Sequence, residues 1–124
     1  MLSTAATIVP RVLIALVFLI GGVAKIAGPG PFLANMEAHH IPGILLPLVI
    51  ALEIGGGLAI LIGWRVAIAG AALGAFCILT AVIFHSDFGN RAEITSFLKD
   101  LAISGGLLAM ALAAFRSRSL AATG

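Results

Sequence analysis

One acidic residue, Glu53, lies alone in a long apolar stretch, IALEIGGGLAI (residues 50–60), and three glycines follow it directly. A charge at the centre of a membrane-spanning helix costs roughly 2.5–3.5 kcal/mol on insertion scales unless it is paired or protonated. An ionisable residue in such a helix is therefore a candidate for a binding or proton-transfer site. The sequence has to supply a partner for this carboxylate.

Three cations in other apolar stretches are candidate partners for Glu53: Lys99, Arg11 and Lys25. At 1.5 Å per helical residue, the expected membrane depth of Lys99 differs from that of Glu53 by only about 7 Å. Arg11 lies at a comparable distance on the other side, but its long side chain is expected to extend to the membrane surface. Lys25 lies near the end of its apolar stretch, so its expected membrane depth differs most from that of Glu53. We therefore predict that Lys99 is the partner of Glu53.

Two interpretations of this ion pair stay open from the sequence. The pair is either a clamp that fixes how the helices pack or a site for a ligand or a proton. His85 is a further candidate for such a site, because its helical face also carries Gly74 and is expected at the outer end of the helices. The simpler interpretation of His85 is an interfacial histidine without a ligand.

The composition indicates the environment of these charges. The chain has 124 residues, of which 61% are hydrophobic and only 10% are charged, whereas soluble domains are roughly a quarter charged. A chain of this length cannot hide so much apolar surface from water, so we expect it to be embedded in lipid. The net charge of +2 is too small to indicate nucleic-acid binding. The single cysteine, Cys77, excludes an intramolecular disulfide and a cysteine cluster that binds a metal. No clear metal-binding set is evident.

Four stretches are long and apolar enough to cross a bilayer, which takes about 20 helical residues. They run from about 6 to 27, 42 to 62, 66 to 84 and 95 to 115, and a polar loop is expected between residues 85 and 93. The predicted fold class is all-α, an integral membrane four-helix bundle in a single domain of residues 1–124. More arginines lie at the chain ends and the central turn than in the two longer loops, so the positive-inside rule places both termini in the cytoplasm. These arginines are Arg11, Arg65, Arg116 and Arg118.

Glycines accompany the intramembrane charges on the same helical faces. Small residues let membrane helices approach closely, so these glycines are expected to support helix packing. The full set of glycines expected to support packing, including two on the uncharged third span, is Gly22, Gly56, Gly57, Gly70, Gly74, Gly105 and Gly106. The Gly70-x-x-x-Gly74 motif is expected to pack inside the protein rather than to form a dimer face.

Three segments in this order resemble the DoxX family. RVLIALVFLIGGVAKI (residues 11–26) resembles its first span, IPGILLPLVIALEIGGGLAILIGWRVAIAGAAL (residues 41–73) its second span and following turn, and FLKDLAISGGLLAMAL (residues 97–112) its last span. The resemblance implies a small, multi-pass protein of the bacterial inner (plasma) membrane. The individual residues to which the resemblance extends are Arg11, Lys25, Glu53, Arg65, His85 and Lys99.

The resemblance also suggests a role in redox chemistry. Proteins whose names are related to that of the family include a quinone-linked oxidoreductase subunit and membrane partners of oxidative-stress enzymes. The sequence has no dithiol and no evident dinucleotide or flavin loop, so a bound quinone or a partner subunit would have to carry the electrons. The expected partners are the lipid bilayer, a soluble or membrane redox protein, and further copies of the chain. The alternatives are a non-catalytic scaffold or assembly protein and, ranked last, a carrier of protons or small solutes.

Overall fold

The structure is a computed structural model that describes the backbone of residues 4–123 and the side chains of residues 6–117. Arg118, one of the arginines used to predict orientation, therefore lies outside the described side chains. The described residues form helices and connecting turns without β-strands. The chain divides into two compact units, Met1–Trp64 and Arg65–Gly124, and each is a helical hairpin that we describe by itself.

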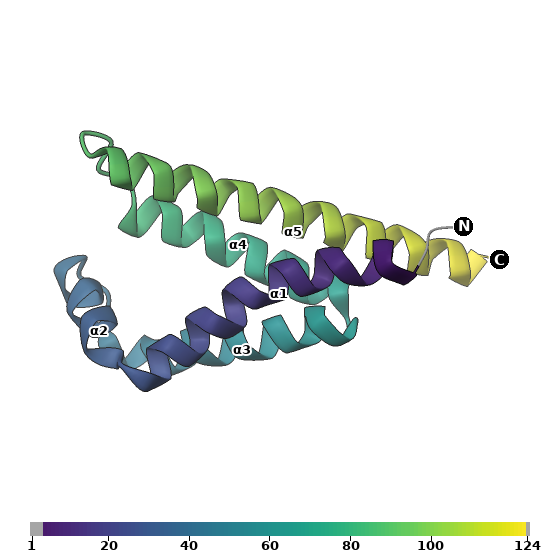
Figure 1. The fold of residues 1–124 in the computed structure, drawn as a ribbon, viewed down its shortest axis with the longest axis horizontal. Helices are drawn as coiled ribbons and strands as arrows, with labels where there is room; N and C mark the ends of the chain where they lie inside the picture. Colours follow the sequence, from purple (N-terminus) through teal and green to yellow (C-terminus); the bar gives the residue numbers. More distant parts are fainter. Residues whose placement is uncertain (1–3, 124) are drawn as a thin grey trace. The chain divides into compact units, whose positions relative to one another are not determined.

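The first hairpin contains two long helices, α1 (Thr4–Ala27) and α3 (Leu46–Ile62), which pack against each other (Figure 1). A shorter helix, α2 (Pro29–Ala38), and a 3-10 turn, η1 (Gly43–Leu45), connect them. Gly28 separates α1 from α2, and Pro29 follows at the first helical position, where its missing N–H costs nothing. The predicted connection between the first two spans is thus partly helical.

The C-terminal end of α3 is closed by Gly63, which has a left-handed backbone with φ of 79°. The N–H of Trp64 donates to the carbonyl oxygen of Ala59, and the N–H of Gly63 donates to that of Ile60. These two hydrogen bonds form a Schellman motif, which favours glycine because other residues rarely adopt this backbone conformation. The chain therefore turns at Gly63, between the second and third apolar stretches.

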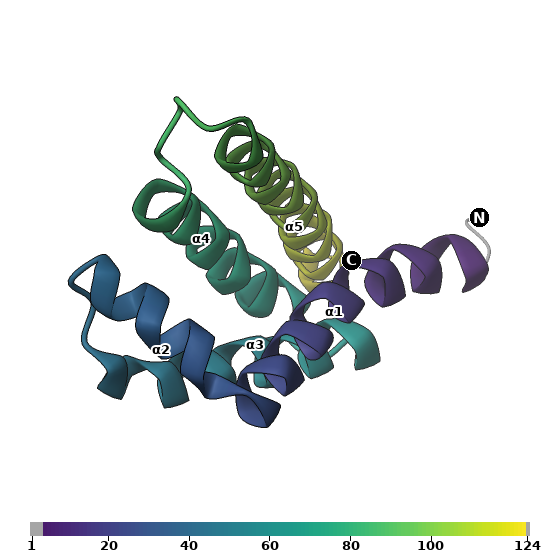
Figure 2. The same ribbon diagram turned by 60° about the vertical axis from the view of Figure 1, so that its left-hand side comes forward.

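The second hairpin consists of α4 (Val66–Phe84) and α5 (Arg91–Thr123), which lie side by side (Figure 2). The helix α5 begins earlier than predicted, inside the expected polar loop. The reason is the side-chain oxygen of Asn90, which accepts a hydrogen bond of 2.9 Å from the N–H of Ala92 and so caps the first turn. Glu93 is therefore helical rather than part of the loop.

Gly70 and Gly74, which were predicted to support helix packing, lie against α5 in this hairpin. A Cβ on Gly70 would lie 3.0 Å from the carbonyl oxygen of Leu107, and one on Gly74 would lie 3.2 Å from Leu108. The hydroxyl of Ser104, which is buried, donates a hydrogen bond of 3.0 Å to the carbonyl oxygen of Gly74. The two helices therefore approach closely along a seam of small residues.

Large apolar side chains cover the outside of both hairpins. Exposed examples are Leu13, Ile20, Ile68, Leu79 and Leu112. In the described residues, four helical segments are long and apolar enough to cross a membrane: Ala6–Ala27, Gly43–Ile62, Val66–Phe84 and Arg91–Ser117. This confirms the predicted all-α membrane fold with its four spans, and the exposed apolar surface fits contact with lipid. The cytoplasmic orientation of the termini stays a prediction.

Candidate functional site: a buried ion pair in the first hairpin

Glu53 forms an ion pair with Lys25. Its Oε1 lies 2.7 Å from the Lys25 Nζ, a short distance typical of a charge-assisted hydrogen bond. The Glu53 side chain is only 5% exposed, whereas that of Lys25 is 18% exposed. The carboxylate is thus enclosed between α1 and α3, and the ammonium reaches nearer to the hairpin surface.

The ranking of partners by depth was therefore wrong, since it placed Lys25 last and Lys99 first. Two features of the helices explain the error. The helix α3 begins at Leu46, later than the predicted span, so Glu53 lies closer to the start of its helix than predicted. Helical side chains also point back toward the N-terminus, so the long Lys25 side chain extends one turn toward Gly21. These two effects together close the expected gap in depth.

Glycines of α1 provide the space for this ion pair. A Cβ on Gly21 would lie 2.8 Å from the Glu53 Oε2, and one on Gly22 would lie 2.5 Å from the Ile54 Cγ1. Gly57 of α3 similarly admits Leu19, whose Cδ2 would lie 3.1 Å from an added Cβ. Gly22 and Gly57, which were predicted to support helix packing, thus lie at the contact between α1 and α3. Sequence reasoning missed Gly21, although its position one turn before Lys25 was a usable signal.

Lys25 also contacts the connecting helix α2. Its Nζ lies over the ring of Phe32, 4.8 Å from the ring centroid, which is within the range of a cation–π interaction. This aromatic contact was not predicted, because Phe32 follows the Gly- and Pro-rich start of the connection. One lysine therefore joins three elements of the hairpin, α1, α2 and α3.

Arg11 lies at the opposite end of the α1–α3 contact, beside Gly63. A Cβ on Gly63 would collide with the Arg11 guanidinium, so the glycine leaves room for this cation as well as providing the left-handed turn. The Nε of Arg11 is buried and has no hydrogen-bond partner within the described part of the chain. A cation at a helix C-terminus is favoured by the helix dipole. Arg11 thus complements the end of α3, and its position next to the end of the spanning segment Gly43–Ile62 fits the expected extension of its side chain to the membrane surface.

The remaining candidate residues belong to the second hairpin. Lys99 is exposed on α5 and forms no ion pair with the described side chains of its own hairpin. Within this hairpin Gly105 has open space at its Cβ position and Gly106 is exposed, and the packing role expected for these two glycines stays a prediction. In the first hairpin Gly56 is half-buried.

His85, at the end of α4, lies between two carboxylates of α5. Its Nδ1 is 3.3 Å from the Glu93 Oε2, and its Nε2 is 3.8 Å from the Asp100 Oδ2. Sequence reasoning did not connect these acids with His85. The available signal was their spacing of two helical turns, which puts both on one face of α5.

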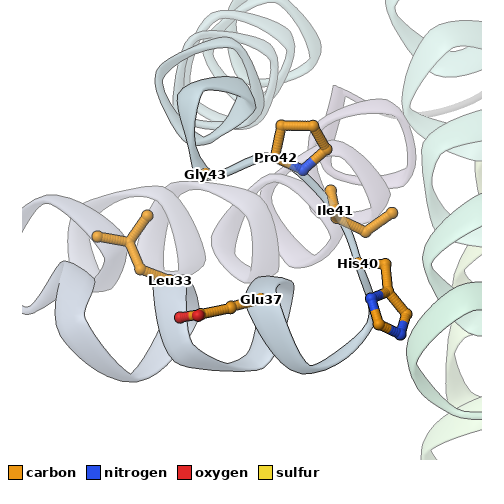
Figure 3. Close-up of a pocket in the computed structure, with 6 residues that line it drawn as sticks. All are labelled: Leu33, Glu37, His40, Ile41, Pro42 and Gly43. Carbon is orange, nitrogen blue, oxygen red and sulfur yellow. The ribbon is translucent and has the colours of Figure 1, made fainter.

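A shallow pocket of about 570 Å³ lies beside α2 and the turn that follows it. It is lined by Leu33, Glu37, His40, Ile41, Pro42 and Gly43. Figure 3 shows the polar groups of Glu37 and His40 pointing apart, so they do not converge on one point in the pocket. The buried ion pair is therefore the better candidate for a functional site.

Four spanning helices and a charged pair buried between two of them define a multi-pass membrane protein. The DoxX family model matches residues 6–86, and the chain belongs to the DoxX family. It is 41% identical over 111 residues to a protein of Escherichia coli (strain K12) named Inner membrane protein YqjF, covering 90% of this chain and 85% of that protein. No solved structure matches. These findings identify a multi-pass inner membrane protein.

Proposed function

We propose that the protein is the membrane subunit of a quinone-linked oxidoreductase and that the Lys25–Glu53 pair holds the head group of the quinone. The observation that carries the proposal is the unequal burial of the pair. Glu53 is enclosed at 5% exposure, and Lys25, at 18%, presents its ammonium toward the hairpin surface. An intramembrane charged pair with one accessible member is the type of group that binds a polar head inside lipid.

The chemistry of a quinone head group fits these side chains. The ammonium of Lys25 can donate a hydrogen bond to a quinone carbonyl, and the Phe32 ring, 4.8 Å from that ammonium, offers an aromatic surface for the quinone ring. Reduction of a quinone to a quinol takes up two electrons and two protons. The chain contributes a carboxylate and an ammonium that can transfer protons, and a partner redox protein supplies the electrons.

Quinone retention tests this proposal directly. The protein is purified in native lipid nanodiscs, and quinone per protein is measured by mass spectrometry relative to the surrounding lipid. We expect enrichment in the unaltered protein and at least a tenfold loss in Lys25→Met and in Glu53→Gln, equivalent to about 1.4 kcal/mol of binding. The matched control is Lys99→Met, which removes an exposed lysine of the other hairpin and should leave retention unchanged.

A double variant separates binding from folding. Lys25→Met/Glu53→Leu removes both charges together, so it should restore a stable hairpin while quinone enrichment stays absent. Equal quinone content in all variants, or no enrichment in the unaltered protein, would contradict the proposal.

The alternative is a non-catalytic scaffold that recruits a partner enzyme, and one observation favours it. Gly21 lies against the Glu53 carboxylate so closely that little space is left on that side of the pair. In this case the pair acts only as a clamp. Crosslinking in the native membrane would then recover a partner protein from a preparation that contains no enriched quinone.

A further inference from the structure

The loop end of the second hairpin contains three ionisable side chains in a row. The His85 imidazole lies between Glu93, which is 3.3 Å from its Nδ1, and Asp100, which is 3.8 Å from its Nε2. All three side chains are partly buried, at 30%, 29% and 24% exposure for His85, Glu93 and Asp100 respectively. The row lies in the α4–α5 hairpin and is independent of the function proposed for the other hairpin.

The geometry of the ring favours a proton over a metal ion at this place. The two nitrogens of an imidazole point in different directions, so two carboxylates on opposite nitrogens cannot share one metal ion with that ring. Consistent with this, the described residues contain no group of three His, Cys, Asp or Glu side chains arranged to hold a metal ion. An imidazole can, however, accept a proton at one nitrogen and release another from the second nitrogen.

We propose that His85 is a proton shuttle between Glu93 and Asp100. Glu93, in the first turn of α5, takes a proton from water at the loop and donates it to Nδ1 of the ring. The imidazolium then releases the proton on Nε2 to the Asp100 carboxylate. Glu93 loses one proton and Asp100 gains one, while His85 changes from the Nε2–H to the Nδ1–H tautomer. Rotation of the ring, or exchange of its proton with water, resets the shuttle.

The two carboxylates give this transfer a direction along the helix. Positions 93 and 100 of α5 are separated by about 10 Å along the helix axis, because each residue advances 1.5 Å. Asp100 lies deeper in the spanning segment Arg91–Ser117 than Glu93 does. The shuttle therefore moves a proton from the helix end toward the membrane interior.

Few other charges lie at this end of the hairpin. Asp87, Arg91 and Lys99 are exposed, and in the described part of the chain none of them forms an ion pair with the three shuttle residues. The Asp87 carboxylate instead accepts a hydrogen bond of 3.3 Å from the N–H of Gly89 in the loop. Asp87 is thus a suitable control, as a nearby carboxylate outside the shuttle.

The tautomer of His85 tests the two carboxylate contacts. Nitrogen-15 spectra of histidine-labelled protein in bilayers are recorded at alkaline pH, and the His85 signal is assigned by its loss in His85→Gln. We expect mostly the Nε2–H tautomer in Glu93→Gln, where Asp100 is the only remaining carboxylate acceptor, and mostly the Nδ1–H tautomer in Asp100→Asn, where Glu93 is the only remaining carboxylate acceptor. Asp87→Asn should match the unaltered protein. The same tautomer in both shuttle variants would overturn the proposal.

The rate of proton arrival at Asp100 tests the transfer itself. After a rapid pH drop, infrared spectroscopy follows the carboxyl band that is absent in Asp100→Asn. We expect His85→Gln to slow its appearance by about a hundredfold, at the low end of the effect of a positioned proton-transfer group. Glu93→Gln should slow it as well, and Asp87→Asn should not. An unchanged rate in His85→Gln would mean that water protonates Asp100 directly, and this would overturn the shuttle.

Discussion

In the first hairpin a buried ion pair, Lys25–Glu53, joins the two spanning helices, whereas in the second hairpin the buried link is the hydrogen bond from Ser104 to Gly74. The ionisable side chains that contact each other in the second hairpin lie at its loop end, around His85. Both hairpins use glycine to bring their helices together. They differ because the helix contact of the first hairpin contains a charged pair, whereas that of the second contains small residues and an uncharged hydrogen bond.

This difference predicts unequal sensitivity to substitution. A buried ion pair stabilises a structure only while both partners are present, because removal of one leaves an unpaired charge away from water. A hydroxyl-to-carbonyl hydrogen bond between membrane helices contributes much less. The first hairpin should therefore respond strongly to single charge changes, and the second should respond mainly to changes in side-chain size.

The largest effect is expected from breaking the ion pair. Glu53→Gln and Lys25→Met should each lower the free energy of unfolding by about 3–5 kcal/mol, because each leaves its partner buried and unpaired. The double variant Lys25→Met/Glu53→Leu should return to within about 1 kcal/mol of the unaltered protein. Reversible unfolding in mixed micelles measures all three values. Additive losses in the double variant would show that the two side chains do not interact.

An intermediate effect is expected from filling the glycine contacts. Gly22→Ala in the first hairpin and Gly70→Ala in the second should each cost about 1–3 kcal/mol, because the added methyl group overlaps a neighbour. The matched controls are Gly55→Ala and Gly105→Ala, which have open space and should be neutral or stabilising by up to about 1 kcal/mol. Equal effects at packed and open glycines, measured by the same unfolding assay, would contradict the close approach of the helices.

The smallest effect is expected at Ser104. Ser104→Ala removes the hydrogen bond to Gly74 and should lower the free energy of unfolding by about 0.6 kcal/mol, and by no more than about 1.7 kcal/mol. A loss as large as that of Glu53→Gln would remove the contrast between the two hairpins.

The spans of this fold were predictable because long apolar stretches in a short chain leave few alternatives to membrane helices. The connections were less predictable. The helix α2 (Pro29–Ala38) begins in a Gly- and Pro-rich segment that is typical of a loop. The early start of α5 depends on one side-chain cap from Asn90, within a segment whose composition indicated a polar loop.

The acid of the candidate site was predictable, and its partner was not. Glu53 is conspicuous because it is a single charge among apolar residues. Its pairing with Lys25 depends on where α3 begins, on the direction of a lysine side chain and on the missing Cβ of Gly21. None of these follows from axial depth alone. The row around His85 was missed for a related reason, since its contacts form only once α4 and α5 are paired.

The most direct test is the distance between the Lys25 Nζ and the Glu53 carboxyl carbon in a lipid bilayer. Solid-state NMR measures their nitrogen–carbon dipolar coupling in specifically labelled protein. A contact of 2.7 Å between Nζ and Oε1 predicts a strong coupling, which should disappear in Lys25→Met with the Glu53 carboxyl carbon still labelled. A strong coupling of the Glu53 carboxyl carbon to Lys99 instead, or to no lysine at all, would contradict the assigned ion pair.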